Sequence, residues 1–134
     1  MKELIVKASL ECLDEVIDFV NKELDRNNCP SEFQGNIDLA VEEIFTNIAN
    51  YAYRPASGSA AISIAVGEAI VIRFEDTGKP YNPLERPDPD LDKPLMERDI
   101  GGLGVFLVKK IMDKVDYTRI ENKNVLVLTK KCGC

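Results

Sequence analysis

Residues 37–53, IDLAVEEIFTNIANYAY, constrain the fold more than any other segment, because a core-helix pattern carries polar residues along its edge. At about 100° per residue, a helix gathers the apolar residues of this segment into one broad stripe. Glu43, Asn47 and Asn50 follow one margin of that stripe, whereas Glu42 points roughly the opposite way. We therefore predict a buried helix whose two adjacent glutamates have different environments. The stripe consists of Ile37, Ala40, Val41, Ile44, Phe45, Ile48, Tyr51 and Ala52.

The polar margin of this helix has two interpretations. A carboxylate and two amides at i, i+4 and i+7 can hold a hard cation or orient a water, because both tasks need oxygen ligands in a fixed geometry. The same pattern is also typical of the solvated edge of a core helix. The helix alone leaves both interpretations open.

Composition excludes several classes of protein. A chain of 134 residues, 45% hydrophobic and 30% charged, predicts one globular domain over residues 1–134. The formal net charge of −6, without a cluster of Lys and Arg, argues against direct nucleic-acid binding. No apolar run reaches the roughly 18 residues of a membrane span, so we expect a cytoplasmic protein without a membrane partner. The four cysteines lack zinc-site spacing and the chain has no histidine, so we expect reduced thiols.

Hydrophobic periodicity predicts the element order β-α-α-β-β-loop-α-β-β. Ser9 and the capping-box pattern Ser31-x-x-Gln34 indicate two helix starts, and residues 122–124 indicate the turn of a closing hairpin. This order predicts an α/β two-layer sandwich, with a mixed, mainly antiparallel sheet and the helices on one face. The strands are expected at residues 2–8, 61–66, 69–76, 117–121 and 125–130.

Two further segments have features of a binding site. Five prolines and alternating charges between residues 77 and 99 predict a long loop, which is either a lid or an unstructured insertion. The glycines at residues 101–104 open a helix, where free N–H groups and the helix dipole favour phosphate, although a tight helix start with positive φ explains them equally. Asp76-Thr77-Gly78 by itself indicates a turn. Together with the edge of the 37–53 helix, these segments supply the parts of a Mg-nucleotide site.

Three motifs carry a family resemblance. EIFTN at 43–47, DTGKPYNP at 76–83 and GGLGVFLVKKIMD at 101–113 resemble, in order and spacing, the three ATP-binding boxes of the gyrase/heat-shock chaperone/histidine kinase superfamily. The chain is most similar to the anti-sigma factor serine/threonine protein kinases, because Pro80-Tyr81-Asn82-Pro83 continues the second box as that family's often does. The resemblance covers nearly the whole chain and implies a histidine kinase-like ATPase fold, with ATP and Mg²⁺ as cofactors and an ATP lid at about 79–100.

The resemblance also implies roles for individual residues. It implies that Asn47 ligates Mg²⁺ and that Glu43 is the catalytic residue that activates the attacking hydroxyl. Asp76 is expected to recognise adenine N6. The other expected nucleotide contacts are Gly78 beside the base, the main chain of Gly102, Leu103 and Gly104 at the phosphates, Thr129 near adenine, Asn50, and Arg98 as a lid cation.

The function implied by this family is a protein kinase that regulates transcription. Such a kinase phosphorylates a Ser or Thr of an anti-sigma factor antagonist, and it alternatively sequesters an RNA polymerase sigma factor. A homodimer is also implied. An alternative function, from a different class of protein, is a nucleotide-gated binding module without significant phosphotransfer. A third interpretation is an α/β domain that binds no nucleotide.

Overall fold

The computed structural model describes residues 1–53, 57–85 and 100–131, and for residues 100–103 it describes only the course of the helix. Five strands and three α-helices follow the predicted order. They are β1 (Lys2–Lys7), α1 (Leu13–Arg26), α2 (Ser31–Asn47), β2 (Ser59–Val66), β3 (Ala69–Asp76), α3 (Ile100–Ile111), β4 (Lys114–Ile120) and β5 (Lys123–Lys131). Three short helical turns join them: η1 (Leu10–Cys12), η2 (Ile48–Ala52) and η3 (Pro83–Glu85).

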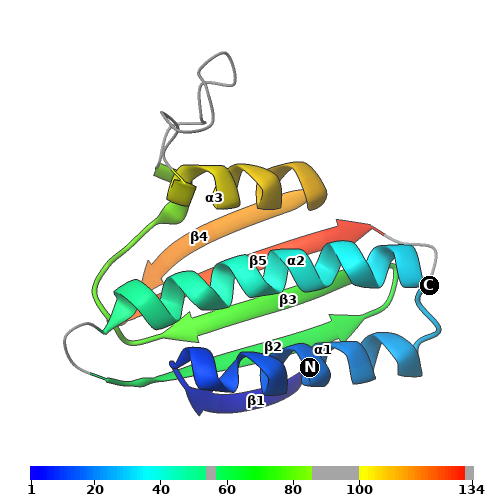
Figure 1. The fold of residues 1–134 in the computed structure, drawn as a ribbon, viewed down its shortest axis with the longest axis horizontal. Coiled ribbons are helices and arrows are strands. Elements are labelled where there is room, and N and C mark those ends of the chain that lie inside the picture. Colours follow the sequence, from blue (N-terminus) through cyan, green and yellow to red (C-terminus); the bar gives the residue numbers. More distant parts are fainter. Residues whose placement is uncertain (54–56, 86–99, 132–134) are drawn as a thin grey trace.

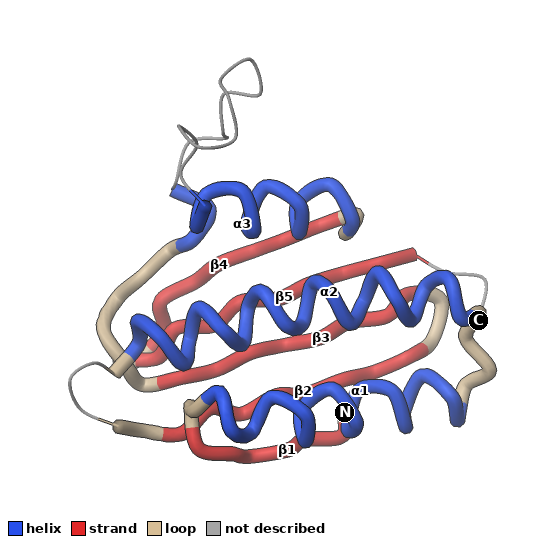
Figure 2. Tube along the Cα trace, in the orientation of Figure 1, coloured by secondary structure: helices blue, strands red, loops and turns tan. Residues whose placement is uncertain are grey.

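The strands form one sheet in the order β1-β2-β3-β5-β4, and every described pairing is antiparallel. All three α-helices cover the same face of this sheet, with α2 in the middle (Figure 1). The predicted two-layer α/β sandwich is confirmed. This connectivity places the C-terminal end of α2, the end of β3 and the start of β5 at the same end of the molecule (Figure 2).

The core lies between α2 and the central strands. In β3 the side chains of Ile70, Ile72 and Phe74 alternate toward the helices and are buried. Burying side chains of this size contributes about 1.5–3 kcal/mol each. The period of two continues to Asp76, which is 6% exposed, so the carboxylate at the end of β3 faces the helical layer rather than solvent. Among the described residues, no helix is both long and apolar enough to cross a membrane.

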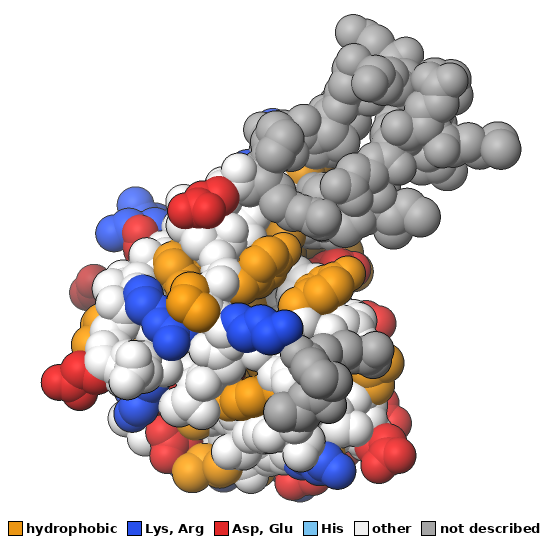
Figure 3. All heavy atoms as spheres, turned by 90° about the vertical axis from the view of Figure 1, so that its left-hand side faces the viewer, with side chains coloured by type: hydrophobic (Ala, Val, Ile, Leu, Met, Phe, Trp, Pro, Cys, Tyr) orange, Lys and Arg blue, Asp and Glu red, His pale blue; other side chains and the backbone are white. Residues whose placement is uncertain are grey.

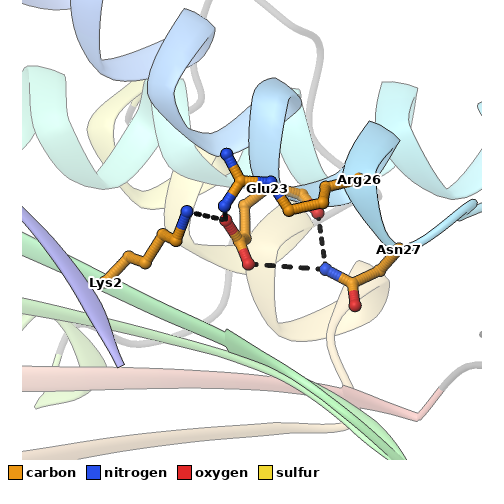
Figure 4. Close-up of polar contacts among 4 residues, drawn as sticks. All are labelled: Lys2, Glu23, Arg26 and Asn27. Carbon is orange, nitrogen blue, oxygen red and sulfur yellow. Dashed lines mark hydrogen bonds and ion pairs between the residues drawn. The ribbon is translucent and has the colours of Figure 1, made fainter.

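A small polar cluster ties the sheet edge to α1. Glu23 of α1 pairs with Lys2 of β1 and with Arg26, each at 3.5 Å (Figure 4). The side chain of Asn27 donates to the main-chain oxygen of Glu23 at 2.8 Å and so caps the last turn of α1. The two ion pairs are largely solvent-exposed on the cationic side, so their contribution to stability is small.

The predicted start of α2 needs correction. Pro30 is its N-cap residue, no side chain caps the helix, and Ser31 already has a helical position, so the predicted capping box is wrong. At its other end α2 continues into η2, which has π-helical geometry. The wider turn changes the angular step beyond Asn47, and this explains why Tyr51 is 51% exposed although an ideal α-helix would place it in the apolar stripe.

Two other local predictions have mixed outcomes. Ser9 caps as expected, but its hydroxyl accepts from the Glu11 amide of η1 at 3.3 Å rather than from α1 directly. The closing hairpin is confirmed, but its turn consists of Glu121 and Asn122, with φ of 49° and 68°. The turn therefore lies earlier than predicted, and Asn124 belongs to β5.

The expectation of reduced thiols is wrong for Cys29. This residue, which is buried in the connection between α1 and α2, is disulfide-bonded. Cys12 is free, as predicted. Cysteine spacing gave no indication of this bond, because spacing alone does not determine which thiols meet in the fold.

Candidate active site

One pocket lies between the end of α2, η2, the end of β3 and the β4–β5 hairpin. Together with the open space at its mouth, it encloses about 410 Å³. Its lining is mostly apolar with a few polar side chains: Ile44, Asn47, Ile48, Ala52, Phe74, Asp76, Tyr81, Pro83, Tyr117, Asn124 and Leu126. On the face of the molecule at this end, hydrophobic and basic side chains lie close together (Figure 3).

Asp76 is the buried carboxylate of this pocket. Its Oδ1 accepts from the main-chain N–H of Gly78 at 3.0 Å and from Nδ2 of Asn124 at 2.9 Å. Among the described residues, no donor contacts Oδ2. Oδ2 is therefore the oxygen of this carboxylate that is left to accept from a ligand in the pocket.

Gly78 lets the turn after β3 approach the end of η2. A Cβ atom at this position would overlap the main-chain oxygen of Ala52, and that oxygen accepts from the N–H of Lys79 at 2.8 Å. Nη1 of Arg119 donates to the Gly78 oxygen at 2.9 Å from the other side. The glycine is required here for backbone packing, whereas its predicted role beside a base stays a prediction.

Glu43 lies against the first turns of α3. A Cβ atom at Gly104 would overlap Oε2 of Glu43, so this carboxylate occupies the space that the glycine leaves open. Glu43 is half-buried and Glu42 is exposed, which confirms the predicted difference between the two. Burial, with a smaller contribution from the negative charge of Glu42, raises the pKa of Glu43 above its usual range.

Asn47 lies one turn after Glu43 and lines the pocket. Asn50 does not line it, because η2 changes the helical pitch between the two amides. In the described part of the chain, no three Cys, Asp or Glu side chains form a metal-binding group. An oxygen from Asn47 nevertheless suits Mg²⁺, which is commonly held by one or two protein oxygens together with phosphates and waters.

Thr129 is not part of this site. It pairs with Val71 and Lys114, whereas the β5 residue opposite Asp76 is Asn124. The five-residue separation along an extended strand is roughly 16 Å, so Thr129 and Asp76 cannot contact the same base. The prediction for Thr129 is therefore wrong, because the sequence does not show the register between β3 and β5.

The remaining predicted residues are only partly described. Arg98 and most of the predicted lid lie outside the described residues. Gly102 and Leu103 belong to the first turn of α3, where N–H groups lack intrahelical partners. No described glycine has a positive φ, so the interpretation of residues 101–104 as a left-handed helix start is wrong.

Sequence reasoning missed three residues of the pocket. The ring centroids of Tyr81 and Tyr51 are 6.0 Å apart, so the two rings form an aromatic edge. Tyr117 and Asn124 enter from β4 and β5 and are joined by a hydrogen bond of 2.5 Å. The alternation of β4 could have placed Tyr117 on the inner face, but Asn124 was assigned to a turn.

Comparison with known proteins assigns this chain to a class of ATPase domains. Residues 6–130 match the histidine kinase-like ATPase domain, and the chain belongs to that family. Serine/threonine-protein kinase BtrW of Bordetella bronchiseptica is 26% identical over 107 residues, which cover 78% of this chain and 75% of BtrW. Serine-protein kinase RsbW of Bacillus cereus strain 03BB102 is 30% identical over 97 residues, covering 69% of this chain and 61% of RsbW. These relatives confirm the predicted resemblance to the anti-sigma factor kinase branch.

Solved structures show the same fold. The crystal structure of the RsbU and RsbW domains of a Mycobacterium tuberculosis protein matches with a TM-score of 0.65 and 12% identity, over 98% of this chain and 33% of that one. The histidine kinase domain of a blue-light activated kinase from Erythrobacter litoralis matches with a TM-score of 0.54 and 20% identity, over 77% of this chain and 46% of that one.

Proposed function

We propose that this chain is a protein kinase that binds Mg-ATP and transfers its γ-phosphate to a Ser or Thr of a partner protein. One observation carries the proposal: the Glu43 carboxylate lies against Gly104 of α3, while Asn47, one turn further along α2, shares a pocket with Asp76. The proposed base therefore lies one helical turn before the proposed metal ligand, and that ligand lines the same pocket as the proposed purine acceptor.

The pocket suits adenine at its inner end. Its apolar side chains can cover the faces of a purine, and Oδ2 of Asp76 can accept from the 6-amino group. Guanine has an acceptor, its O6 atom, at that position. Neither O6 nor Oδ2 of Asp76 would then have a donor, so the site favours ATP over GTP.

The phosphate end of the site would be formed by α2 and α3. Asn47 would hold Mg²⁺, which supplies charge neutralisation at the phosphates. The N–H groups at the start of α3 would bind the phosphates, because a helix N-terminus favours anions. Their neighbour Glu43 would accept the proton of the attacking hydroxyl, and its raised pKa makes it a better base near neutral pH than an exposed glutamate.

The proposed substrate is an anti-sigma factor antagonist, and the proposed second partner is an RNA polymerase sigma factor, with a homodimer as the working assembly. The support is the similarity to proteins named BtrW and RsbW, which are serine/threonine kinases by name. Phosphorylation would release the antagonist and leave the kinase free to sequester the sigma factor.

Three variants test the kinase assignment in a phosphotransfer assay with labelled ATP and an antagonist protein from the same genome. Glu43→Gln should keep Mg-ATP affinity and lose roughly 10²–10⁴ in transfer rate, because only the proton acceptor is removed. Asn47→Ala should lose metal-dependent binding as well as transfer. Glu42→Gln is the matched control, since this neighbouring carboxylate is exposed and should transfer at the wild-type rate.

Two outcomes would contradict the assignment in different ways. Glu43→Gln with wild-type transfer would remove Glu43 from the chemistry. A wild-type chain that binds Mg-ATP and its partner but transfers no phosphate would instead be the nucleotide-gated binding module.

A further inference from the structure

Asn124 is a buried amide that connects three walls of the pocket. It is 6% exposed and stands opposite Asp76 in the β3–β5 pairing. Its Nδ2 donates to Oδ1 of Asp76 at 2.9 Å and to the main-chain oxygen of Lys79 at 2.7 Å. Its Oδ1 accepts from the N–H of Tyr81 at 3.3 Å and from the hydroxyl of Tyr117 at 2.5 Å. All four hydrogen-bonding positions of the amide are therefore used.

The orientation of this amide is set by its backbone partners. A main-chain oxygen such as that of Lys79 can only accept, and the N–H of Tyr81 can only donate. A rotated Asn124 would place its NH₂ group against a donor and its oxygen against two acceptors. Nδ2 must therefore face Asp76, and the hydroxyl of Tyr117 must donate to Oδ1.

This orientation determines which oxygen of Asp76 remains for a ligand. Asn124 and the N–H of Gly78 both donate to the same oxygen, Oδ1. Two donors on one oxygen hold the carboxylate plane, and they leave Oδ2 as the acceptor for the pocket. Without Asn124, the N–H of Gly78 alone would hold the group, and the carboxylate could turn about its Cβ–Cγ bond.

We propose that Asn124 is the positioning residue that makes this site selective for 6-aminopurine nucleotides. The inference rests on the proposed function, since it concerns the base of the nucleotide bound there. Asn124 acts through Asp76, whose Oδ2 it directs at the amino group, and through residues 79–81, which it holds against the β4–β5 hairpin. Tyr117 supports this role by fixing the amide.

The test compares Mg-ATP with the Mg complex of purine riboside triphosphate, which differs only in lacking the 6-amino group. Calorimetric titration of the wild-type chain should show a preference for ATP of about tenfold or more, because the amino group donates to a charged acceptor. In Asn124→Ala this preference should fall below about threefold. A merely structural role would weaken both nucleotides equally and keep the preference, and that result would overturn the proposal.

Two more variants separate positioning from loss of folding. Asn122→Ala changes the turn of the same hairpin, at φ 68°, without touching the network, so it should lower the melting temperature and keep the wild-type preference. Tyr117→Phe removes one hydroxyl and leaves the strand intact. It should reduce the preference by about threefold, and an unchanged preference would overturn the proposal even if Asn124→Ala does not fold.

The wild-type measurement distinguishes this inference from the function on which it rests. If the wild-type chain binds neither nucleotide, the proposed kinase function fails. If it binds both with equal affinity, nucleotide binding stands and the proposed role of Asn124 is overturned.

Discussion

Replacing Gly104 by alanine should separate catalytic geometry from stability. Gly104 lies inside α3, where an alanine is more favourable than a glycine by about 1 kcal/mol. The new Cβ would overlap Oε2 of Glu43, which is the far end of a flexible side chain. Turning that side chain away from its rotamer costs about 0.5–1.5 kcal/mol. The two effects nearly cancel, so we expect a free energy of unfolding within about 1 kcal/mol of the wild-type value.

The rate of phosphotransfer, unlike the stability, should change in Gly104→Ala. Displacing the carboxylate by about 1 Å can cost roughly 10²-fold in rate, so phosphotransfer should fall by about 10–10²-fold while Mg-ATP affinity changes little. Gly35→Ala is the matched control, because a Cβ built on this exposed glycine of α2 has no atom within 4 Å beyond its chain neighbours and the backbone of its own helix. It should raise the melting temperature by roughly 3–6 °C and leave transfer unchanged.

A thermal denaturation cycle tests the contact itself, independently of activity. In a Glu43→Ala background the overlap is gone, so Gly104→Ala should then raise the melting temperature as much as Gly35→Ala does. The reasoning is refuted if Gly104→Ala gives the same increase with and without Glu43, because the carboxylate would then not occupy that space.

Two further predictions concern single carboxylates. Asp76→Asn should weaken Mg-ATP binding by about 1–3 kcal/mol, measured by titration calorimetry, because one orientation of the amide faces the adenine amino group with a donor; unchanged affinity would remove Asp76 from the base pocket. Burial, opposed by the hydrogen bond from Asn21, raises the pKa of Asp38 above its usual value, so the folded chain binds more protons than the unfolded chain between those two pKa values. The free energy of unfolding should therefore fall as pH rises through that window, and it should fall less in Asp38→Asn. Melting curves between about pH 4 and 8 measure this difference. Parallel pH profiles of the wild-type and Asp38→Asn chains would contradict it.

The sequence predicted the architecture because each element has a clear period. The alternation in β3 and the stripe of α2 define their buried faces, and short connections leave few topologies. Glu43 and Asn47 were predicted as site residues because polar side chains are unusual at the edge of a buried helix, whereas the predicted role of Asp76 came from the family resemblance. Where periodicity was interrupted, prediction failed: the π-helical turn η2 moved Tyr51 and Asn50 out of their expected places.

Residues that depend on strand register could not be predicted. Asn124 belongs to the site only because β5 pairs with β3 so that this residue stands opposite Asp76, and a shift of one residue would turn its side chain to the other face. The two-residue turn at Glu121 and Asn122 sets that register, since both residues have positive φ. Asparagine often adopts a positive φ, whereas glutamate rarely does. Glu121 was therefore not recognised as a turn residue, and the turn was placed too late.

Calorimetric titration of the wild-type chain with Mg-ATP and with Mg-GTP tests the central claim most directly, because a nucleotide site at Asp76 is the basis of every role proposed for the pocket. We predict saturable binding of one Mg-ATP per chain, a raised melting temperature in its presence, and weaker binding of Mg-GTP. Neither heat nor a change in melting temperature at millimolar Mg-ATP would contradict the account. Equal affinity for the two nucleotides would contradict the role of Asp76 as the acceptor for the adenine amino group.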